Sequence, residues 1–284
     1  MSQTATLLLH SPDQRGIVAG VSGFLYENGA NILHADQHQD NDLGLFFMRV
    51  EWDLDGFALD EAAFRAQFGG LAERFQMRWR YVTGARKPRV AIYVSQYLHG
   101  LVDLLYRHSI GELNCEIPLI ISNHDAARPM AEFHKIPFRH MALTKSNKAR
   151  VEAEQLRLLE ENGVDLVVLA RYMQILSPNF VERYPQKIIN VHHSFLPAFS
   201  GARPYQAAYH RGVKLIGATS HYVTAELDEG PIIEQDVVRV SHRDQLDDLI
   251  QKGRDLERIV LSRAVRWHLD NRILLYSHKT VIFD

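Results

Sequence analysis

Apolar runs of strand length alternate with helical stretches over most of the chain after residue 88, and this alternation constrains the fold most. The runs typical of strands are 89–94, 117–122, 165–170, 187–190, 215–222 and 231–240. Residues 98–108, 147–162 and 242–269 show helical spacing of their apolar side chains. Strands that alternate with helices indicate a mainly parallel sheet covered by helices. We therefore expect a Rossmann-like α/β fold over residues 85–284.

The first 84 residues follow another order. Strand-like runs at 4–10, 31–39, 45–52 and 77–82 are interrupted by helical stretches at 17–28 and 62–75. The order β-α-β-β-α-β predicts a four-stranded antiparallel sheet with two helices on one face, the ferredoxin-like arrangement. Between the two patterns, Gly84, Arg86, Lys87 and Pro88 separate apolar runs and indicate a linker. We predict two domains, residues 1–84 and 85–284.

The charge balance limits the partners that the chain is expected to bind. The sequence has 32 basic and 34 acidic residues, a net charge of -2, whereas a nucleic-acid binder usually has a basic excess. Cys115 is the single cysteine, so a disulfide within the chain is excluded and a reducing cytoplasm is favoured. No apolar run reaches about 18 residues, and the N-terminus lacks the pattern of a signal peptide. We expect a cytoplasmic protein with no nucleic acid and no membrane among its partners.

Polar side chains gather where two predicted strands end. Asn190 and His192 lie two positions apart at the end of a strand, so they share one face, whereas His193 is predicted to point away. His221 ends a later strand, and Asp228 precedes the turn formed by Gly230 and Pro231. Ligands of open α/β sheets bind beyond the carboxyl ends of the strands. This pattern predicts a site at that edge of the sheet.

An amide, an imidazole and a carboxylate in one pocket suit chemistry on an amide or a formyl group. The amide donates to a developing oxyanion, the imidazole stabilises it or moves a proton, and the carboxylate acts as a base or orients the imidazole. The same residue types could hold a metal ion, but no HExxH-like spacing is present and His192 and His193 face opposite ways. We expect no catalytic metal.

These residues resemble the folate-dependent formyltransferases. The resemblance lies in Asn190-Val191-His192, Ser194-Phe195-Leu196-Pro197, Gly201 and Leu227-Asp228-Glu229-Gly230-Pro231, and it covers residues 88–284. Within that fold, the segments 192–199 and 201–205 are similar to the formyltetrahydrofolate deformylases. The resemblance implies a hydrolase that acts on the amide bond of 10-formyltetrahydrofolate, with Asn190, His192 and Asp228 as its catalytic residues. Formate and tetrahydrofolate are then the products, in one-carbon and purine metabolism, and no separate cofactor is implied.

The same resemblance implies which residues bind the folate. They are Met173, Gln174, Ile175, Leu176, His193, His221, Val223, Ala225 and Leu227. Ala225 departs from the pattern, because relatives often carry an acidic residue there. Which of Asp228 and His192 is the formal base stays open from sequence.

Two other functions remain as alternatives. A formyltransferase to another acceptor is disfavoured because residues 94–100 contain one glycine and the bulky Tyr97 and Leu98, whereas a Gly-rich loop is needed to hold an acceptor phosphate. The chain also ends soon after the core of the second domain, so we expect no counterpart of the C-terminal domain of the methionyl-tRNA formyltransferases. A non-catalytic sensor of amino acids is disfavoured by the intact set of Asn190, His192 and Asp228.

The first domain resembles the ACT regulatory domains, through residues 13–18 and 28–32. That family implies a small amino-acid effector, with Asp13, Arg15, Gly16, Ile17 and Asn31 as the candidate residues, and a homo-oligomer. A helix N-terminus offers free N–H groups to a carboxylate, which makes such a site physically reasonable. The alternative is that Gly16 only eases the turn and the domain serves assembly.

Overall fold

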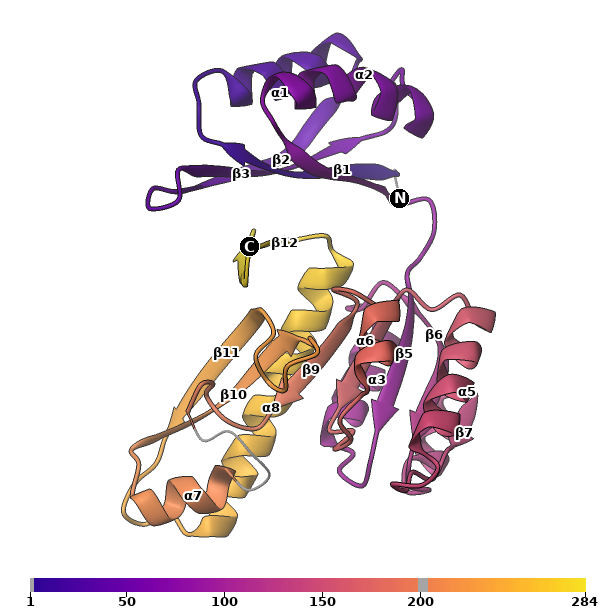
Figure 1. Ribbon diagram of the computed structural model, residues 1–284, viewed down its shortest axis with the longest axis vertical. Coiled ribbons are helices and arrows are strands. Elements are labelled where there is room, and N and C mark those ends of the chain that lie inside the picture. The colour runs from indigo at the N-terminus through magenta and orange to yellow at the C-terminus, as the bar shows by residue number, and fades with distance from the viewer. Residues whose placement is uncertain (1–2, 199–203) are drawn as a thin grey trace. The chain divides into compact units, whose positions relative to one another are not determined.

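The computed structural model describes residues 3–198 and 204–284, which fall into two compact units (Figure 1). Unit 1 contains the chain up to Arg86 together with 271–276 and 281–284. Unit 2 contains 87–270 and 277–280. In the described part of the chain no helix is both long and apolar enough to cross a membrane.

Unit 1 has the predicted ferredoxin-like fold. Its elements are β1 (Thr4–Pro12), α1 (Ile17–Glu27), β2 (Asn31–Asp40), β3 (Leu45–Asp53), α2 (Glu61–Arg74) and β4 (Arg78–Thr83). The sheet order is β2-β3-β1-β4, and each neighbouring pair is antiparallel. Helices α1 and α2 cover one face, where Val21, Phe64 and Phe68 pack with Leu7 and Trp52. The alternation of side chains along β1 and β3 thus supplies one buried apolar face to the helices.

The opposite face of this sheet is covered by the end of the chain. Strands β12 (Ile273–Tyr276) and β13 (Lys279–Ile282) form a two-stranded hairpin. Tyr276 packs on Phe47 with ring centroids 4.5 Å apart, and Leu274 and Phe283 join the same cluster with Leu8. Because Leu8 and Phe47 alternate with side chains that face the helices, the sheet is apolar on both faces.

Unit 2 is an α/β unit with a seven-stranded sheet of order β11-β10-β9-β8-β5-β6-β7. Its strands are β5 (Arg89–Val94), β6 (Glu116–Ser122), β7 (Phe138–His140), β8 (Leu166–Ala170), β9 (Ile188–His192), β10 (Leu215–Tyr222) and β11 (Ile232–Arg239). Its helices are α3 (His99–Ser109), α4 (Arg128–Phe133), α5 (Lys148–Glu161), α6 (Pro178–Arg183), α7 (Pro204–Arg211) and α8 (Leu246–Leu269). Strand β10 runs antiparallel to β9 and β11, whereas the pairs from β9 to β7 are parallel. The predicted mostly parallel sheet is confirmed.

The two faces of this sheet are buried against different helices. Leu156 of α5 and Phe180 of α6 pack with Tyr93 and Leu169 in one core cluster. On the other face, a Cβ added at Gly100 near the start of α3 would contact Ala170 and Leu261 of α8, so α3 and α8 approach the sheet closely there. Strands β5, β8 and β9 are therefore buried on both sides, and their carboxyl ends meet at one edge of the sheet.

Candidate active site

Asn190 and His221 lie opposite each other on neighbouring strands. They are paired in the antiparallel register of β9 and β10. The Asn190 amide Nδ2 donates to Nε2 of His221 at 3.2 Å, and Nδ1 of His221 donates to the Tyr222 carbonyl at 3.0 Å. Burial lowers the pKa of His221, which keeps the ring neutral and its Nε2 free to accept. His221 thus fixes the amide, and the second Nδ2 proton of Asn190 is left for a ligand.

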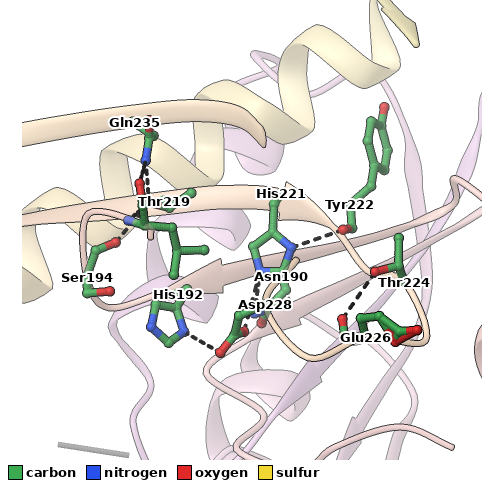
Figure 2. Close-up of polar contacts among 11 residues, drawn as sticks. Asn190, His192, Ser194, Thr219, His221, Tyr222, Thr224, Glu226, Asp228 and Gln235 are labelled. Atoms are coloured by element: carbon green, nitrogen blue, oxygen red, sulfur yellow. Dashed lines mark hydrogen bonds and ion pairs between the residues drawn. The ribbon is translucent and has the colours of Figure 1, made fainter. Parts of the chain in front are cut away.

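His192 and Asp228 form the second pair of the site (Figure 2). Nδ1 of His192 lies 3.2 Å from Oδ2 of Asp228, and the two side chains are 6% and 12% exposed. Oδ1 of Asp228 lies 3.7 Å from Nε2 of His221. Nε2 of His192 is buried and has no hydrogen-bond partner among the described residues. The imidazole is therefore held through one nitrogen and keeps the other for chemistry.

The loop that carries Asp228 has a constrained backbone. Asp228 has φ 58°, in the left-handed region, and it is followed closely by Gly230. A Cβ at Gly230 would overlap the carbonyl of Tyr222, whose N–H donates to the Pro231 carbonyl at 2.9 Å. A glycine is required because the two backbones approach so closely. Strand β10 and this turn together place the Asp228 carboxylate.

The pKa of Asp228 is lowered in this setting. Burial alone would raise it, but the hydrogen bond and charge of His192 outweigh burial, and His221 acts in the same direction. Asp228 is therefore a carboxylate near neutral pH, and the Nδ1 proton of His192 donates to it.

A pocket of about 280 Å³ opens beside these residues. Asn190, His192 and Asp228 line it, as do the nine residues expected to bind the folate, which are Met173, Gln174, Ile175, Leu176, His193, His221, Val223, Ala225 and Leu227. Met173, Ile175 and Leu227 are 48%, 61% and 59% exposed. Since these apolar side chains line the pocket rather than the core, they offer a surface for a flat ring.

His193 does not point away from the site. It lines the same pocket as His192, and the two rings have centroids 5.1 Å apart. Strand β9 ends at His192, so the strict alternation of an extended segment does not reach the next residue. The expected opposite orientation of His193 is therefore wrong, whereas its contact with the folate stays a prediction.

The loop after β9 is braced by residues that sequence analysis did not single out. Thr219 of β10 donates to the Ser194 carbonyl at 2.8 Å and accepts from the Leu196 N–H at 3.1 Å. Gln235 of β11 donates to Thr219 Oγ1 at 2.9 Å and to the Leu196 carbonyl at 3.0 Å (Figure 2). No spacing motif links these residues, because the contacts arise from neighbouring strands of the folded sheet. Arg171 and Tyr172 also line the pocket, directly before the expected folate residues 173–176.

Unit 1 has a groove of its own, of about 620 Å³. Asp13, Gly16 and Ile17 line it at the start of α1, and Gln37–Gln39 of β2 face them. Gly16 has φ 93°, so a side chain there would strain the turn. The other two candidate residues, Arg15 and Asn31, do not line this groove.

Within residues 3–198 and 204–284, no group of three or more histidine, cysteine, aspartate or glutamate side chains is arranged to hold a metal ion. The expected motif residue Gly201 and the segment around it lie outside the described residues.

Comparisons with known proteins agree with this architecture. The sequence matches the formyl transferase family over residues 88–265 and the ACT domain family over residues 5–68. A formyltetrahydrofolate deformylase of Synechocystis sp. is 56% identical over 99% of this chain and 98% of its own. The crystal structure of a formyltetrahydrofolate deformylase from Pseudomonas syringae superimposes with a TM-score of 0.96, at 49% identity, over 100% of this chain and 95% of its own. A glycinamide ribonucleotide transformylase from Symbiobacterium toebii, 28% identical, covers 71% of this chain and 97% of its own, with a TM-score of 0.66.

Proposed function

This chain belongs to the formyltetrahydrofolate deformylases, which hydrolyse 10-formyltetrahydrofolate to formate and tetrahydrofolate, and we propose how its residues carry out that reaction. The folate is the substrate, and we propose that no separate cofactor takes part. The supporting observation is that polar contacts connect four side chains that line one pocket, those of Asn190, His192, His221 and Asp228.

Asn190 stabilises the charge that develops on the formyl oxygen. One Nδ2 proton is held by His221, and the other is available to the oxygen as the carbonyl becomes tetrahedral. Because the amide is already oriented before the substrate binds, the donor does not have to reorganise during the reaction.

His192 moves the proton, and Asp228 orients His192. The low pKa of Asp228 makes its carboxylate a weak base, whereas it is well suited to hold the Nδ1 proton of the imidazole. The water oxygen bonds to the formyl carbon as its proton passes to Nε2 of His192. The bond from the formyl carbon to N10 then breaks, and His192 returns the proton to N10. Formic acid and tetrahydrofolate result, and formic acid releases its proton to solvent to give formate.

The folate ring lies against the pocket wall made by residues 173–176 and 223–227. Leu176 is buried in the core and anchors this wall, while Met173 and Ile175 are exposed toward solvent. An apolar wall with a few converging polar groups is the usual form of such a site.

A formate-release assay tests this function. Purified protein is incubated with 10-formyltetrahydrofolate, with and without glycinamide ribonucleotide as a phosphorylated acceptor. We expect equal formate release in both cases. Formyl transfer to the added acceptor, or absence of formate, would overturn the assignment.

We propose further that residues 1–84 regulate the reaction and that residues 85–284 catalyse it. A small amino acid is the proposed effector, its carboxylate held by the N–H groups at the start of α1 beside Gly16. A homo-oligomer in the cytoplasm is the proposed form of the enzyme. Calorimetry with the common amino acids tests the effector, since no heat of binding with any of them would leave an assembly role for this domain.

A further inference from the structure

Five side chains form a polar cluster beside the catalytic pocket, and we name it the Arg171 cluster. They are Tyr97, His99, Arg171, Tyr205 and Glu257. Tyr97 follows β5, His99 begins α3, and Arg171 follows β8, so three of them lie at the carboxyl ends of the two central strands. Tyr205 comes from α7 and Glu257 from α8. The reaction proposed above makes no use of these residues.

Glu257 is the centre of the cluster. Its side chain is 1% exposed, and both carboxylate oxygens are occupied. His99 Nε2 lies 2.8 Å from Oε2, the Tyr205 hydroxyl donates to Oε1 at 2.7 Å, and Arg171 Nε lies 3.4 Å from Oε2. Burial alone would raise the pKa of Glu257, but the hydrogen bond from His99 and the charge of Arg171 lower it overall. Glu257 and Arg171 therefore form a buried pair whose charges cancel.

Arg171 connects this cluster to the pocket. It lines the catalytic pocket, its side chain is 10% exposed, and its guanidinium lies 5.2 Å from the centre of the Tyr97 ring. Its Nε and Nη1 have no hydrogen-bond partner among the described residues. Its backbone has φ 61°, a conformation that favours glycine. A buried arginine with unpaired donors in this backbone conformation destabilises the folded state, so a structural role alone does not explain it.

The cluster also approaches the catalytic imidazole. The Tyr205 ring lies 5.8 Å from that of His193, which in turn lies 5.1 Å from that of His192. A Cβ at Gly253 of α8 would overlap the Tyr205 hydroxyl, so this tyrosine is packed tightly against the helix. His193 lines both the catalytic pocket and a second pocket of about 350 Å³, and Tyr205 lines the second one. The catalytic pocket itself, at about 280 Å³, is slightly smaller than the roughly 300–1,000 Å³ usual for ligand sites, which suits a single organic substrate.

We propose that the Arg171 cluster excludes an organic amine from the formyl carbon and so restricts the acceptor to water. The inference rests on the proposed reaction at Asn190, His192 and Asp228. The fold does not impose this restriction, because the glycinamide ribonucleotide transformylase described above shares it. Without the cluster, an amine nitrogen can bond to the formyl carbon as the bond to N10 breaks. The proton lost by the amine then passes to N10, and the products are a formamide and tetrahydrofolate.

Product partitioning tests the proposal. The full-length protein is given 10-formyltetrahydrofolate and excess glycinamide, and formate and N-formylglycinamide are quantified by mass spectrometry. Arg171→Gly removes the guanidinium and suits the left-handed backbone. Tyr97→Ala removes a ring that is 43% exposed, so the change is mild for folding. We expect each variant to raise the ratio of N-formylglycinamide to formate at least about tenfold over the wild type.

Arg254→Ala is the matched control, because Arg254 also lies over the Tyr97 ring, at 5.4 Å, but is exposed on α8. Its product ratio should stay within about twofold of the wild type. A purely structural cluster would lower both products together and leave the ratio unchanged, and that result would overturn the proposal. If neither variant produces N-formylglycinamide, whether or not it releases formate, the proposal is also overturned. A wild type that releases no formate would instead contradict the proposed function.

Discussion

Asn190 and His221 face each other across neighbouring strands, and the amide of Asn190 donates to a histidine ring whose other nitrogen donates to the backbone. This chain of two hydrogen bonds requires a neutral His221, because a protonated ring would have no lone pair for the amide. We assign the Asn190 amide to the oxyanion. Its orientation therefore depends on the protonation state of His221, which need not itself contact the formyl group.

We predict that His221→Gln weakens the pH dependence of stability in mild acid. Burial depresses the pKa of His221 below 6.5 in the folded state, so its contribution is complete above about pH 6.5 and is lost as the pH falls toward the folded value. Glutamine does not titrate, and its amide can accept from Asn190 and donate to Tyr222. Urea midpoints measured between about pH 5 and 7.5 should fall less steeply for the variant. Parallel curves for the two proteins would argue against a neutral, buried His221.

We predict that Asp228→Asn lowers kcat by about 10²–10⁴ with a much smaller change in KM. The variant keeps the shape of the side chain but loses the charge that holds the Nδ1 proton of His192, which lies 3.2 Å away. Steady-state formate release gives both constants. Glu229→Gln is the control, because this exposed neighbour on the same loop has no assigned role in the reaction and should keep normal turnover. Near-normal kcat in Asp228→Asn would remove Asp228 from the mechanism.

The positions of the proposed catalytic residues could be predicted from the sequence because local patterns determine them. Asn190 and His192 alternate at the end of a buried strand, and Asp228 lies in a turn with Gly230 and Pro231, so each can be assigned to the same edge of the sheet. The close approach of His192 and Asp228 confirms that these two meet.

The contacts of the Arg171 cluster could not be predicted from the sequence in the same way. Arg171 and Glu257 are separated by 86 positions, and a single arginine after a strand carries no periodic or motif signal. The short elements α4, β7, α6 and α7 were missed as well, because three to eight residues are too few for helical or strand periodicity to appear.

We predict that Glu257→Ala destabilises the protein by about 3–5 kcal/mol, because it leaves the Arg171 guanidinium buried without its carboxylate. Glu257→Gln should cost less, since the amide still hydrogen-bonds to part of the cluster. Urea unfolding followed by circular dichroism measures both. Glu154→Ala is the control, because Glu154 pairs with Arg157 on the surface of α5 and its loss should leave the midpoint unchanged. Equal midpoints for Glu257→Ala and the wild type would contradict a buried charge pair.

We predict that Gly230→Ala lowers turnover, because the added Cβ would overlap the backbone carbonyl of Tyr222 and displace the turn that carries Asp228. A displacement of about 1 Å at a catalytic group commonly costs on the order of 10²-fold in rate.

The control is Gly70→Ala in the exposed middle of α2, where nothing lies within 4 Å of the new Cβ. That change should stabilise unit 1 by about 0.5–1 kcal/mol and leave kcat unaltered, because alanine restricts the unfolded chain and favours the helix. Both variants are assayed for formate release and urea unfolding. A Gly230→Ala protein with wild-type kcat would show that the turn adjusts without moving Asp228, and the positioning role assigned to Gly230 would then be wrong.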